Sequence, residues 1–326
     1  MKILVTGSEG SLMQWVIPVL LKNGHSVLGV DNFARYGEIE RQRNYDFIRG
    51  DLTDEEFVWD LVHQVDGVMQ AAALIYGVGG FHKYPADILS KDIKLHTNIL
   101  EAARVLKRKK ICYISSSMVY ERCQTYPSGE EDVDVSLIPS TDYGLSKLVG
   151  ERLSQAYWKQ YGLKYVIWRP FNIITPYEMG ENEQGISHVF ADYIRNIIKE
   201  KKNPLPIIGD GEQVRCFTWI KDIAYAIGKY SFDDRTDNQT YNLGNPEPIT
   251  MKELARLIYK EAARDNLISA DKELQFETTK SYKDDVLRRI PDITKVQEEL
   301  NWKPTLKVKE TVRACVHHQK TLLKSN

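Results

Sequence analysis

Short apolar, β-branched runs alternate with longer amphipathic stretches over the first half of the chain. Five of these runs predict buried strands: KILVT, HSVLGVDN, DGVMQAAAL, KICYISSS and LKYVIWRPFN. Helical patterns lie between them, at about 11–23, 55–64, 87–108 and 142–161. The stretch YDFIRGDLTD adds a short strand, and its Asp54 is placed to cap the helix that follows. Strands that alternate with helices of this length predict a parallel, doubly wound sheet.

The pattern loosens after about residue 170. The stretches PYEMGENEQG and KNPLPIIGDGEQ are rich in loop-forming residues, and Thr250 is placed to cap the helix in NPEPITMKELARLIYKEAA. We therefore predict a Rossmann-type α/β domain over 1–170, with part of 215–245 returning to it. A smaller α/β lobe that binds substrate is predicted over 171–326.

Composition excludes several classes of partner. The chain has 326 residues, 42% of them hydrophobic, and a formal net charge of −1, so neither nucleic acid nor an anionic membrane surface is expected to bind it. Its four cysteines lack CxxC spacing, which predicts incidental thiols in a reducing compartment and no metal site. No apolar stretch approaches the roughly 20 residues that span a bilayer, and no targeting segment is visible. A cytoplasmic location is expected.

The first strand is followed by a glycine turn. Gly7 and Gly10 stand between the strand and the first helix, where backbone N–H groups can face a pyrophosphate. Asp31 ends the next strand, at a distance suited to an acid that accepts the ribose hydroxyls of NAD. Taken alone, the two glycines could form an ordinary turn, and Asp31 could simply be a turn-forming residue at the end of a strand. The glycine turn and Asp31 together favour a dinucleotide site. The Asp31 carboxylate would repel the 2′-phosphate of NADP, which favours NAD, although Arg35 is close in sequence.

Met13 stands where the third glycine of such a turn is expected. That glycine lets the first helix pack closely on the sheet. Methionine is flexible and can lie along an apolar face, so we expect a slightly displaced helix and a retained site. Pro18 removes a backbone hydrogen bond within this helix and predicts a kink.

A second group of residues suggests acid–base chemistry. Tyr143 and Lys147 are four residues apart at the start of a predicted helix, so their side chains share one face. A lysine ammonium near a phenol lowers the pKa of the phenol, and a phenolate can remove a proton from a sugar hydroxyl. The serines of YISSSMVY end a central strand, where ligands bind in doubly wound sheets. The alternative for the Tyr/Lys spacing alone is a pair on a solvated helix.

These motifs together resemble those of the extended short-chain dehydrogenase/reductase family, the NAD-dependent nucleotide-sugar epimerases and dehydratases. The resemblance covers nearly the whole chain and is much more specific for the superfamily than for a substrate. It implies NAD as cofactor, a nucleotide-sugar substrate and a homodimer paired through helices at about 92–107 and 143–161. The landmarks, in order, are TGSEGS, GDLTD, SSSMVY, YGLSK, RPFN, GDGEQVRCFTWIKDIA, YNLGNPEPIT and LRRIPDITKVQEELNWKP.

The resemblance also implies roles for single residues. Tyr143 would be the catalytic base, with Lys147 as its partner and Ser116 as the catalytic hydroxyl. Lys221 and Asp222 would close a structural loop. The cofactor would be bound by Gly7, Gly10, Ser11, Leu12, Asp31, Asn32, Asp51, Leu52, Ala71, Ala72, Ala73, Tyr143, Lys147 and Pro170. The substrate would be bound by Gly79, Gly80, Ser117, Met118, Asn172, Arg215 and Arg288.

Departures from the family pattern bear on the reaction. In the 4,6-dehydratases that the chain resembles, Asp-Glu follows the catalytic serine or threonine. Related decarboxylases carry Glu at the second of these positions, and 3,5-epimerases use a cysteine there as base. This chain has Ser117 and Met118, and a thioether is a poor proton acceptor. Asp92 and Cys216 also depart from the pattern, standing where Asn and where Asp or Ser are usual.

The residues therefore favour a 4-epimerase that transiently oxidises C4 of a UDP- or GDP-hexose. The stretch LIYGVGGFHKYP is similar to a glycine loop of GDP-mannose 3,5-epimerases and is expected to line the sugar site, although a lid without base specificity is the alternative. A dehydratase, a decarboxylase, a 3,5-epimerase and a net C4 oxidoreductase remain alternatives within the family. A non-catalytic NAD-binding regulator is the alternative outside it.

Overall fold

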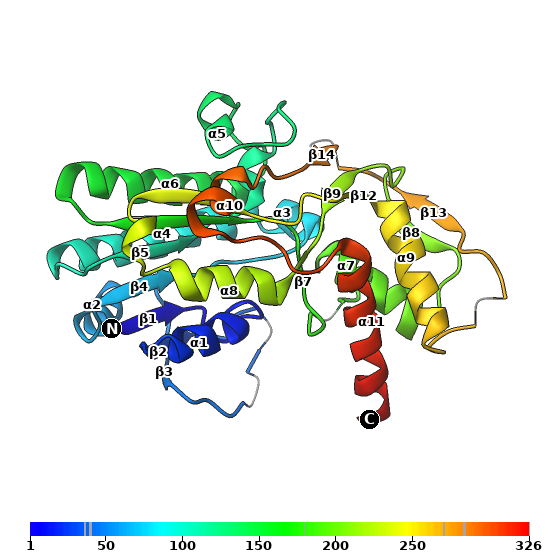
Figure 1. Cartoon of the computed structure of the whole chain (residues 1–326), viewed down its shortest axis with the longest axis horizontal. Coiled ribbons are helices and arrows are strands. Elements are labelled where there is room, and N and C mark those ends of the chain that lie inside the picture. Colours follow the sequence, from blue (N-terminus) through cyan, green and yellow to red (C-terminus); the bar gives the residue numbers. More distant parts are fainter. Residues whose placement is uncertain (36, 39–40, 179, 270, 283–284, 326) are drawn as a thin grey trace.

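The computed structural model describes residues 1–35, 37–38, 41–178, 180–269, 271–282 and 285–325. A large sheet flanked by helices carries the N-terminus, and a smaller group of short strands and helices carries the C-terminus (Figure 1).

The large part is built on a seven-stranded parallel sheet with the order β11-β6-β5-β4-β1-β2-β3. The order reverses between β1 and β4, and in such sheets ligands bind beyond the carboxyl ends of the strands at the reversal. This topology confirms the predicted doubly wound fold. The strands are β1 (Lys2–Thr6), β2 (Ser26–Asp31), β3 (Asp46–Arg49), β4 (Gly67–Gln70), β5 (Ile111–Ile114), β6 (Tyr165–Pro170) and β11 (Gln239–Leu243).

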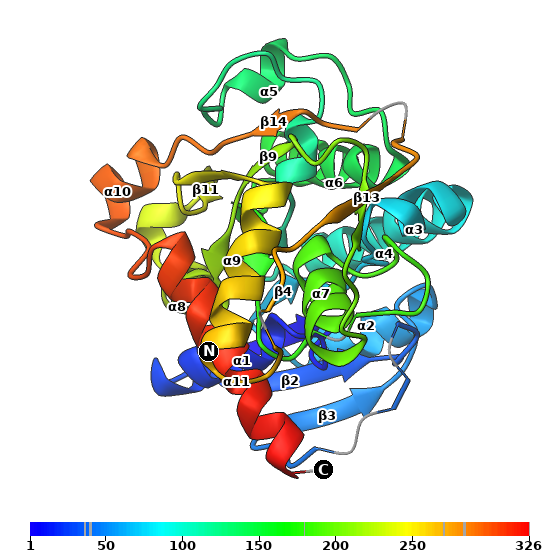
Figure 2. The same cartoon turned by 90° about the vertical axis from the view of Figure 1, so that its right-hand side faces the viewer.

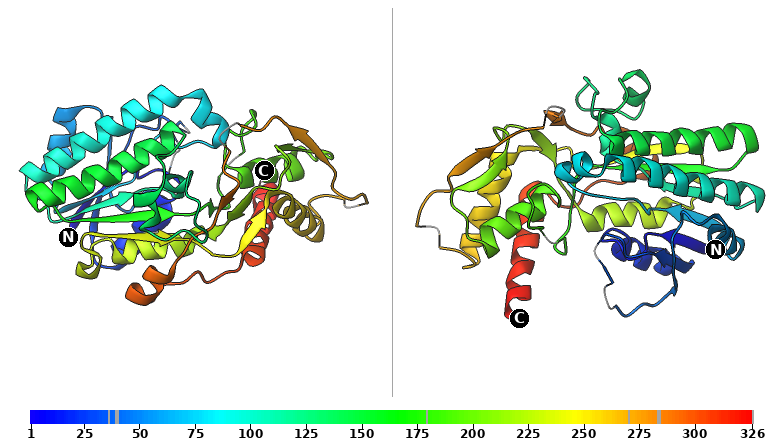
Figure 3. Two further views of the ribbon diagram at one scale, coloured as in Figure 1. Left: turned by 90° about the horizontal axis from the view of Figure 1, so that it is seen from above. Right: turned by 180° about the vertical axis from the view of Figure 1, so that it is seen from behind.

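Helices cover both faces of this sheet. On one face α1 packs against α8, and on the other α4 lies between α2 and α6, with α4 and α6 side by side in Figure 3. The predicted cap is confirmed at Asp54, whose carboxylate accepts the Phe57 N–H, and Thr141 caps α6 in the same way. The helices are α1 (Met13–Lys22), α2 (Glu55–His63), α3 (Val78–Lys83), α4 (Pro85–Val105), α6 (Asp142–Tyr161) and α8 (Ile220–Tyr230).

Met13 is the first residue of α1, and its side chain is buried in the core between the sheet, α1 and α8. A close approach between α1 and α8 depends on a glycine of α8 and not on a glycine at position 13. A Cβ at Gly228 of α8 would lie 2.6 Å from the Val19 Cβ of α1. Helix α1 continues through Pro18, which lies on its exposed side. Met13 therefore fills the space that a glycine would leave open.

The smaller part has its own apolar core, in which α7, α9 and α11 meet the short strands (Figure 2). Thr250 caps α9 as predicted, in a reciprocal capping box with Glu253. The smaller part contains two two-stranded sheets, β7 (Ile173–Ile174) with β10 (Thr218–Trp219) and β8 (Leu205–Ile208) with β13 (Phe276–Thr279). It also contains a three-stranded sheet, in which β9 (Val214–Cys216) lies between β12 (Pro248–Thr250) and β14 (Arg288–Arg289). The remaining elements are η1 (Ser117–Tyr120), α5 (Asp132–Val135), α7 (Val189–Ile194), η2 (Arg195–Lys199), η3 (Asp234–Thr236), α9 (Met251–Arg264), α10 (Thr294–Leu300) and α11 (Val308–Ser325).

The chain crosses between the two parts more than once. After β6 it enters the smaller part, and it then returns to add β11 parallel to β6, with Gln239 opposite Val166 and Leu243 opposite Pro170. A division into domains at residue 170, with a returning segment, stays our prediction. Among the described helices, none is both long and apolar enough to cross a bilayer.

Candidate active site

The glycine turn after β1 has the geometry of a phosphate-binding turn. Gly7 has a φ of +64°, and a Cβ there would lie 3.0 Å from the Ala72 Cα, so a side chain would force the turn away from the loop after β4. The Gly10 N–H donates to the Gly7 carbonyl oxygen at 3.0 Å. Leu12 precedes α1 without any side-chain cap, and the Gln14 and Trp15 N–H groups donate to the Gly10 and Leu12 carbonyls at 3.2 and 3.0 Å, so an anion would be bound by the turn at the start of the helix. These features fit the pyrophosphate of a dinucleotide.

Asp31 lies against this turn. Its carboxylate accepts the Glu9 N–H at 3.1 Å and the Phe33 N–H at 2.8 Å. The neighbouring Glu9 carboxylate is held by both guanidinium nitrogens of Arg43 at 3.0 Å and by the Tyr45 hydroxyl at 2.7 Å. Because Arg43 neutralises the charge of Glu9, the Asp31 carboxylate is the group beside the turn that is unfavourable for the additional phosphate of NADP.

Arg35 is engaged elsewhere. Its guanidinium pairs with Glu181 at 2.6 Å, donates to the Ile75 carbonyl at 2.8 Å and lies 4.6 Å from the centroid of the Tyr76 ring. The side chain thus links the loop after β2 to the smaller part of the molecule. These contacts support NAD over NADP. Arg35 was the residue whose positive charge could have bound the 2′-phosphate of NADP, and in the structure that charge is already paired with Glu181.

The other predicted cofactor residues follow the carboxyl ends of the sheet strands. The Thr6 hydroxyl accepts the N–H groups of Ala71 and Ala72 at 3.0 Å each and so joins the ends of β1 and β4. Asn32 donates to Asp51 at 3.4 Å, joining the ends of β2 and β3. The remaining residues of this set are Ser11 and Leu12 after β1, Leu52 after β3, Ala73 after β4 and Pro170 at the end of β6.

The predicted catalytic residues come together where β5 ends and α6 begins. The Ser116 side chain lies beside the Tyr143 phenol and acts to lower its pKa, and its hydroxyl oxygen accepts the Met118 N–H at 3.1 Å. The Lys147 Nζ lies 5.7 Å from the centroid of the Tyr143 ring and donates to the Ile114 carbonyl at 3.1 Å. Phe81 of α3 stacks on the Tyr143 ring with 4.5 Å between centroids. Both Tyr143 and Lys147 are buried.

The expected lowering of the Tyr143 pKa by Lys147 is wrong for this structure. Burial raises the pKa of Tyr143, while the Ser116 side chain and the charge of Arg289 act in the opposite direction. Burial also lowers the pKa of Lys147, opposed by the carboxylates of Asp92 and Glu151. The ammonium donates to a main-chain carbonyl and not to the phenol, so in this state Lys147 does not offset the effect of burial on the Tyr143 pKa.

Asp92, which departs from the family pattern, is part of the support beneath this site. It is fully buried on α4 and accepts the Leu74 N–H at 3.2 Å and the Ser146 hydroxyl at 3.1 Å. Burial raises the pKa of its carboxyl, and the charge of Lys147 opposes the shift. Asp92 therefore joins α4 to the loop after β4 and to α6.

A buried ion pair next to Ser116, the predicted catalytic serine, was missed from the sequence. Glu151 of α6 pairs with Arg169 of β6 through two contacts, at 2.9 and 2.7 Å, and also accepts the Ser115 hydroxyl. Arg169 donates in addition to the Tyr120 hydroxyl at 2.7 Å. The pair fixes the end of β5 against α6 and β6. The charged Arg169 inside the otherwise apolar pattern of β6 was the available signal.

Two arginines of the smaller part lie near the catalytic residues. Arg215 on β9 and Arg289 on β14 are register partners in neighbouring strands, and Arg289 donates to the Asn172 side-chain oxygen at 2.9 Å and contacts the Met118 sulfur. Arg288, which the sequence suggested, is exposed, because neighbouring residues of a strand point to opposite faces. Arg289 therefore replaces Arg288 as our candidate, beside Arg215, for an arginine that binds the diphosphate of the substrate.

The predicted substrate residues of the glycine loop have a packing role in this structure. The Gly79 N–H donates to the Gly185 carbonyl at 2.9 Å, and a Cβ at Gly80 would lie 2.2 Å from the Tyr76 Cβ. Both glycines are buried, as is Ser117. From this segment Phe81, and not a glycine, touches the catalytic tyrosine.

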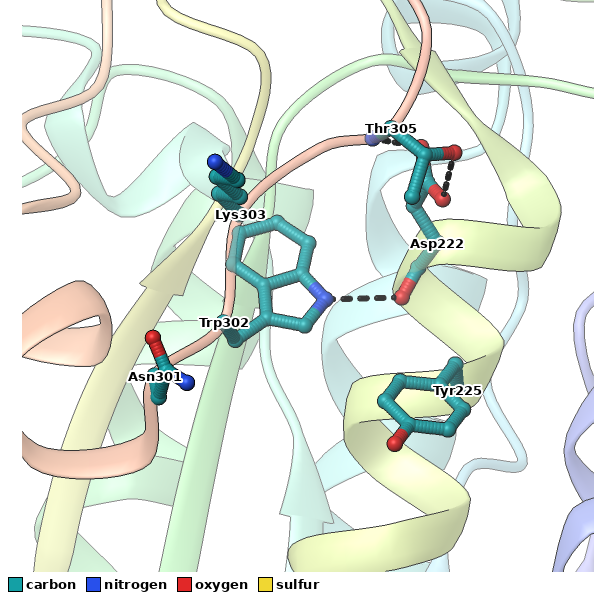
Figure 4. A pocket seen from close by; sticks show the side chains of 6 residues that line it. All are labelled: Asp222, Tyr225, Asn301, Trp302, Lys303 and Thr305. Carbon is teal, nitrogen blue, oxygen red and sulfur yellow. Dashed lines mark hydrogen bonds between the residues drawn. The ribbon is translucent and has the colours of Figure 1, made fainter.

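A surface pocket beside α8 is separate from these residues (Figure 4). The Asp222 carboxylate accepts the N–H and the hydroxyl of Thr305 at 2.9 and 2.6 Å, and its carbonyl accepts the Trp302 indole N–H at 3.1 Å. These bonds attach α8 to the segment after α10. Asp222 thus supports the chain connection, in line with the structural role suggested by the sequence.

Comparison with known proteins agrees with the fold and the motifs. The sequence profile of the NAD dependent epimerase/dehydratase family matches residues 3–244. The chain belongs to this family, a group of NAD-dependent enzymes within the extended short-chain dehydrogenases/reductases.

Individual relatives are similar over almost their whole length. The UDP-glucuronate 4-epimerase of Thermodesulfobacterium geofontis is 30% identical, over 97% of this chain and 95% of that protein. The structure of UDP-glucose 4-epimerase from Thermotoga maritima with UDP-glucose is 26% identical, with a TM-score of 0.83 over 99% of this chain and 100% of that one. UDP-glucuronic acid 4-epimerase from Bacillus cereus, solved with UDP-glucuronic acid and NAD, is 26% identical with a TM-score of 0.81 at the same coverage.

Proposed function

We propose that this protein is an NAD-dependent nucleotide-sugar 4-epimerase that acts by transient oxidation at C4 of a UDP- or GDP-hexose. The observation that carries the proposal is the placement of Ser116 and Lys147 beside Tyr143, next to Ser117 and Met118. The relatives described above act, by their names, at C4 of a nucleotide sugar, and this agrees with the proposal.

The side chains of this protein would accept the proton of the sugar 4-hydroxyl and orient the sugar. NAD, when bound by the glycine turn and Asp31, supplies a reversible hydride acceptor for C4. Tyr143 takes the proton of the 4-hydroxyl, and the Ser116 hydroxyl donates to the same sugar oxygen. Phe81 covers one face of the Tyr143 ring and excludes water from it. When the 4-keto sugar turns its other face before reduction, the configuration at C4 is inverted.

Three of the described residues are poor candidates for a base that would abstract a proton from another carbon. The Met118 thioether cannot take up a proton usefully. The Glu121 carboxylate accepts the Thr141 N–H at 2.8 Å together with its hydroxyl. Burial raises the pKa of the Cys216 thiol to about 12, so it stays protonated at neutral pH. These contacts argue against a dehydratase and against a 3,5-epimerase.

The test is incubation of the NAD-loaded protein with UDP- and GDP-hexoses in D₂O, followed by proton NMR. The expected product differs from the substrate at C4 alone, with no deuterium on carbon. Tyr143→Phe should lower turnover by about 10²- to 10⁴-fold while NAD binding is retained, because one hydroxyl is removed. Deuterium at C3 or C5, or a 6-deoxy-4-keto product, would show a different reaction, and net NADH accumulation would show a C4 oxidase.

We also propose that two copies pair through α4 and α6. The outer surface of these helices carries Val105, Trp158 and Tyr161, with 42%, 40% and 49% of each residue exposed, which is unusual for large apolar side chains. Size-exclusion chromatography with light scattering should give twice the chain mass. Replacing Trp158 and Tyr161 with Lys should shift the protein toward a monomer.

A further inference from the structure

A chain of buried hydrogen bonds connects the loop after β4, where the cofactor is expected, to α6, which carries the predicted catalytic tyrosine and lysine. Each of its side chains has 2% or less of its surface exposed, and the reaction proposed above uses none of them. A buried polar network stabilises a structure only when its members are satisfied, so the direction of each bond can be worked out from donors and acceptors. The members are Thr6 of β1, Gln70 of β4, His96 of α4 and Tyr113 of β5.

The direction of the chain is fixed at Thr6. Its hydroxyl oxygen accepts the N–H groups of Ala71 and Ala72 at 3.0 Å each, so its own proton must be donated. The nearest acceptor is the Gln70 side-chain oxygen at 2.6 Å. The Gln70 NH₂ group therefore faces the His96 ring, with 3.2 Å between its nitrogen and Nδ1. Because Nδ1 accepts this bond, the proton of the neutral ring is on Nε2.

His96 continues the chain to Tyr113. Its Nε2 lies 2.9 Å from the Tyr113 hydroxyl oxygen, and the two rings meet edge to face with 4.9 Å between centroids. The Tyr113 hydroxyl in turn donates to the Lys147 carbonyl oxygen, at 3.5 Å. The Lys147 Nζ lies 5.5 Å from the centroid of the same ring. Tyr113 therefore contacts both the main chain and the ammonium side of the predicted catalytic lysine.

The chain positions groups and does not conduct a proton to the site. It ends at a main-chain carbonyl, and the His96 ring is held neutral, because burial and the charge of Lys147 lower its pKa well below the usual range. A proton on Nδ1 would also face the NH₂ group of Gln70. The packing around Tyr113 is tight, since a Cβ at Gly150 of α6 would lie 2.2 Å from the Tyr113 hydroxyl oxygen.

Helix α4 connects the same two segments a second time, one turn earlier. Asp92 accepts the Leu74 N–H of the loop after β4 and the Ser146 hydroxyl of α6. Residues four apart share one face of a helix, so Asp92 and His96 form two parallel connections from the cofactor loop to α6. The second of them meets α6 at Lys147 itself.

We propose that His96 is a positioning residue for Lys147: through Tyr113 it holds α6, and with it the lysine, at a fixed place relative to the cofactor loop. The inference rests on the proposed function for its effect on turnover, because Lys147 acts there together with Tyr143. Misplacing a reacting group by about 1 Å can cost about 10²-fold in rate. A residue away from the reacting atoms can therefore affect the rate without binding the substrate.

The first experiment measures steady-state kinetics of C4 inversion with the full chain loaded with NAD. Tyr113→Phe removes one hydroxyl, and His96→Leu removes both ring nitrogens. Each should lower kcat by about 10- to 100-fold, while the KM for the sugar stays within about twofold because uniform binding is retained. His96→Gln, whose amide N–H can replace the Nε2–H, should recover most of the loss. An unchanged kcat in Tyr113→Phe and His96→Leu would overturn the inference.

A matched control lies on the opposite face of the sheet. The Ser231 hydroxyl oxygen accepts the Cys112 thiol at 3.1 Å and the Trp168 indole N–H at 2.9 Å, within the core formed with α1 and α8. Ser231→Ala also disrupts a buried polar cluster, so it should lower the Tm as Tyr113→Phe does and leave kcat unchanged. A loss of kcat that follows the Tm in every variant, the control included, would show a purely structural role and contradict the proposal.

The second experiment needs no sugar. Calorimetry of NAD binding to the natural chain, His96→Leu, Lys147→Met and the double variant gives a double-mutant cycle. The loss of NAD affinity caused by Lys147→Met should be at least about threefold smaller when His96 is already replaced, because the lysine is then no longer held in place. Additive losses would refute the coupling.

The outcomes for the two proposals are distinguishable. If the cycle shows coupling but no nucleotide sugar is inverted at C4, the positioning of Lys147 by His96 stands and the 4-epimerase proposal fails. If sugars are inverted at C4 and the losses of NAD affinity are additive, the epimerase proposal stands and the role of His96 fails.

Discussion

Restoring the missing glycine should damage the protein and not improve its cofactor site. Met13 is 2% exposed and packs in the core shared by the sheet, α1 and α8. Truncating a buried methionine to alanine costs about 2–5 kcal/mol, and glycine adds up to about 1 kcal/mol through backbone entropy. For Met13→Gly we expect the free energy of unfolding to fall by about 3–5 kcal/mol. Relaxation of neighbouring side chains into the cavity would reduce this loss.

The measurement is thermal unfolding with and without NAD. At about 1.5 °C per kcal/mol for a chain of 326 residues, the Tm of Met13→Gly should fall by about 4–8 °C. The NAD affinity of the folded protein should change little, since Gly7, Gly10 and Asp31 are untouched. Met13→Leu conserves volume and should cost less than about 1.5 kcal/mol. A glycine variant as stable as the natural chain, with tighter NAD binding, would refute the view that Met13 is a core residue.

Three further changes probe other parts of the structure. Asp31→Ala removes the carboxylate that accepts the Glu9 and Phe33 N–H groups. In calorimetric titrations the ratio of the affinities for NAD and NADP should fall by about tenfold, or about 1.4 kcal/mol. A natural protein that prefers NADP would contradict our assignment. Glu151→Gln leaves Arg169 buried without its anion. The free energy of unfolding measured in urea should fall by about 3–5 kcal/mol, and a fall below about 1 kcal/mol would show that the ion pair is dispensable. Burial raises the pKa of Asp192 to about 6 from 3.8, so its contribution to stability, on the order of 3 kcal/mol, is present below about pH 4 and is lost as the pH rises through about 6. Asp192→Asn should flatten the profile of unfolding free energy between pH 4.5 and 7, and an unchanged profile would refute the assignment.

Local signals in the sequence predicted much of the fold. The helix expected at 142–161 has these bounds in the structure, and the caps at Asp54 and Thr250 form as expected. Such features depend on periodicity and on side chains that bond to the adjacent backbone, so neighbouring residues are sufficient to specify them. The glycine turn was recognisable for the same reason.

Features that depend on contacts between distant segments could not be predicted in this way. The strand that holds Arg288 and Arg289 has only two residues, so no alternation was available to show which side chain points inward. Gly79 is close to a segment about a hundred residues later, and sequence spacing does not reveal that contact. The bond between Lys147 and the Ile114 carbonyl, which separates the ammonium from the phenol, is likewise a product of tertiary packing.

The late position of β11 bears on how the chain folds during synthesis. β6 is complete at Pro170, but its neighbour on the outer side is not available until Leu243 has been made and has left the ribosome. Through that interval a nascent chain exposes an unpaired, apolar strand edge, the kind of edge that pairs with other chains. A fragment that stops at 170 would keep this edge permanently, so we expect it to aggregate where the full chain does not. Any division of this protein for expression should therefore keep residues 239–243 with the sheet.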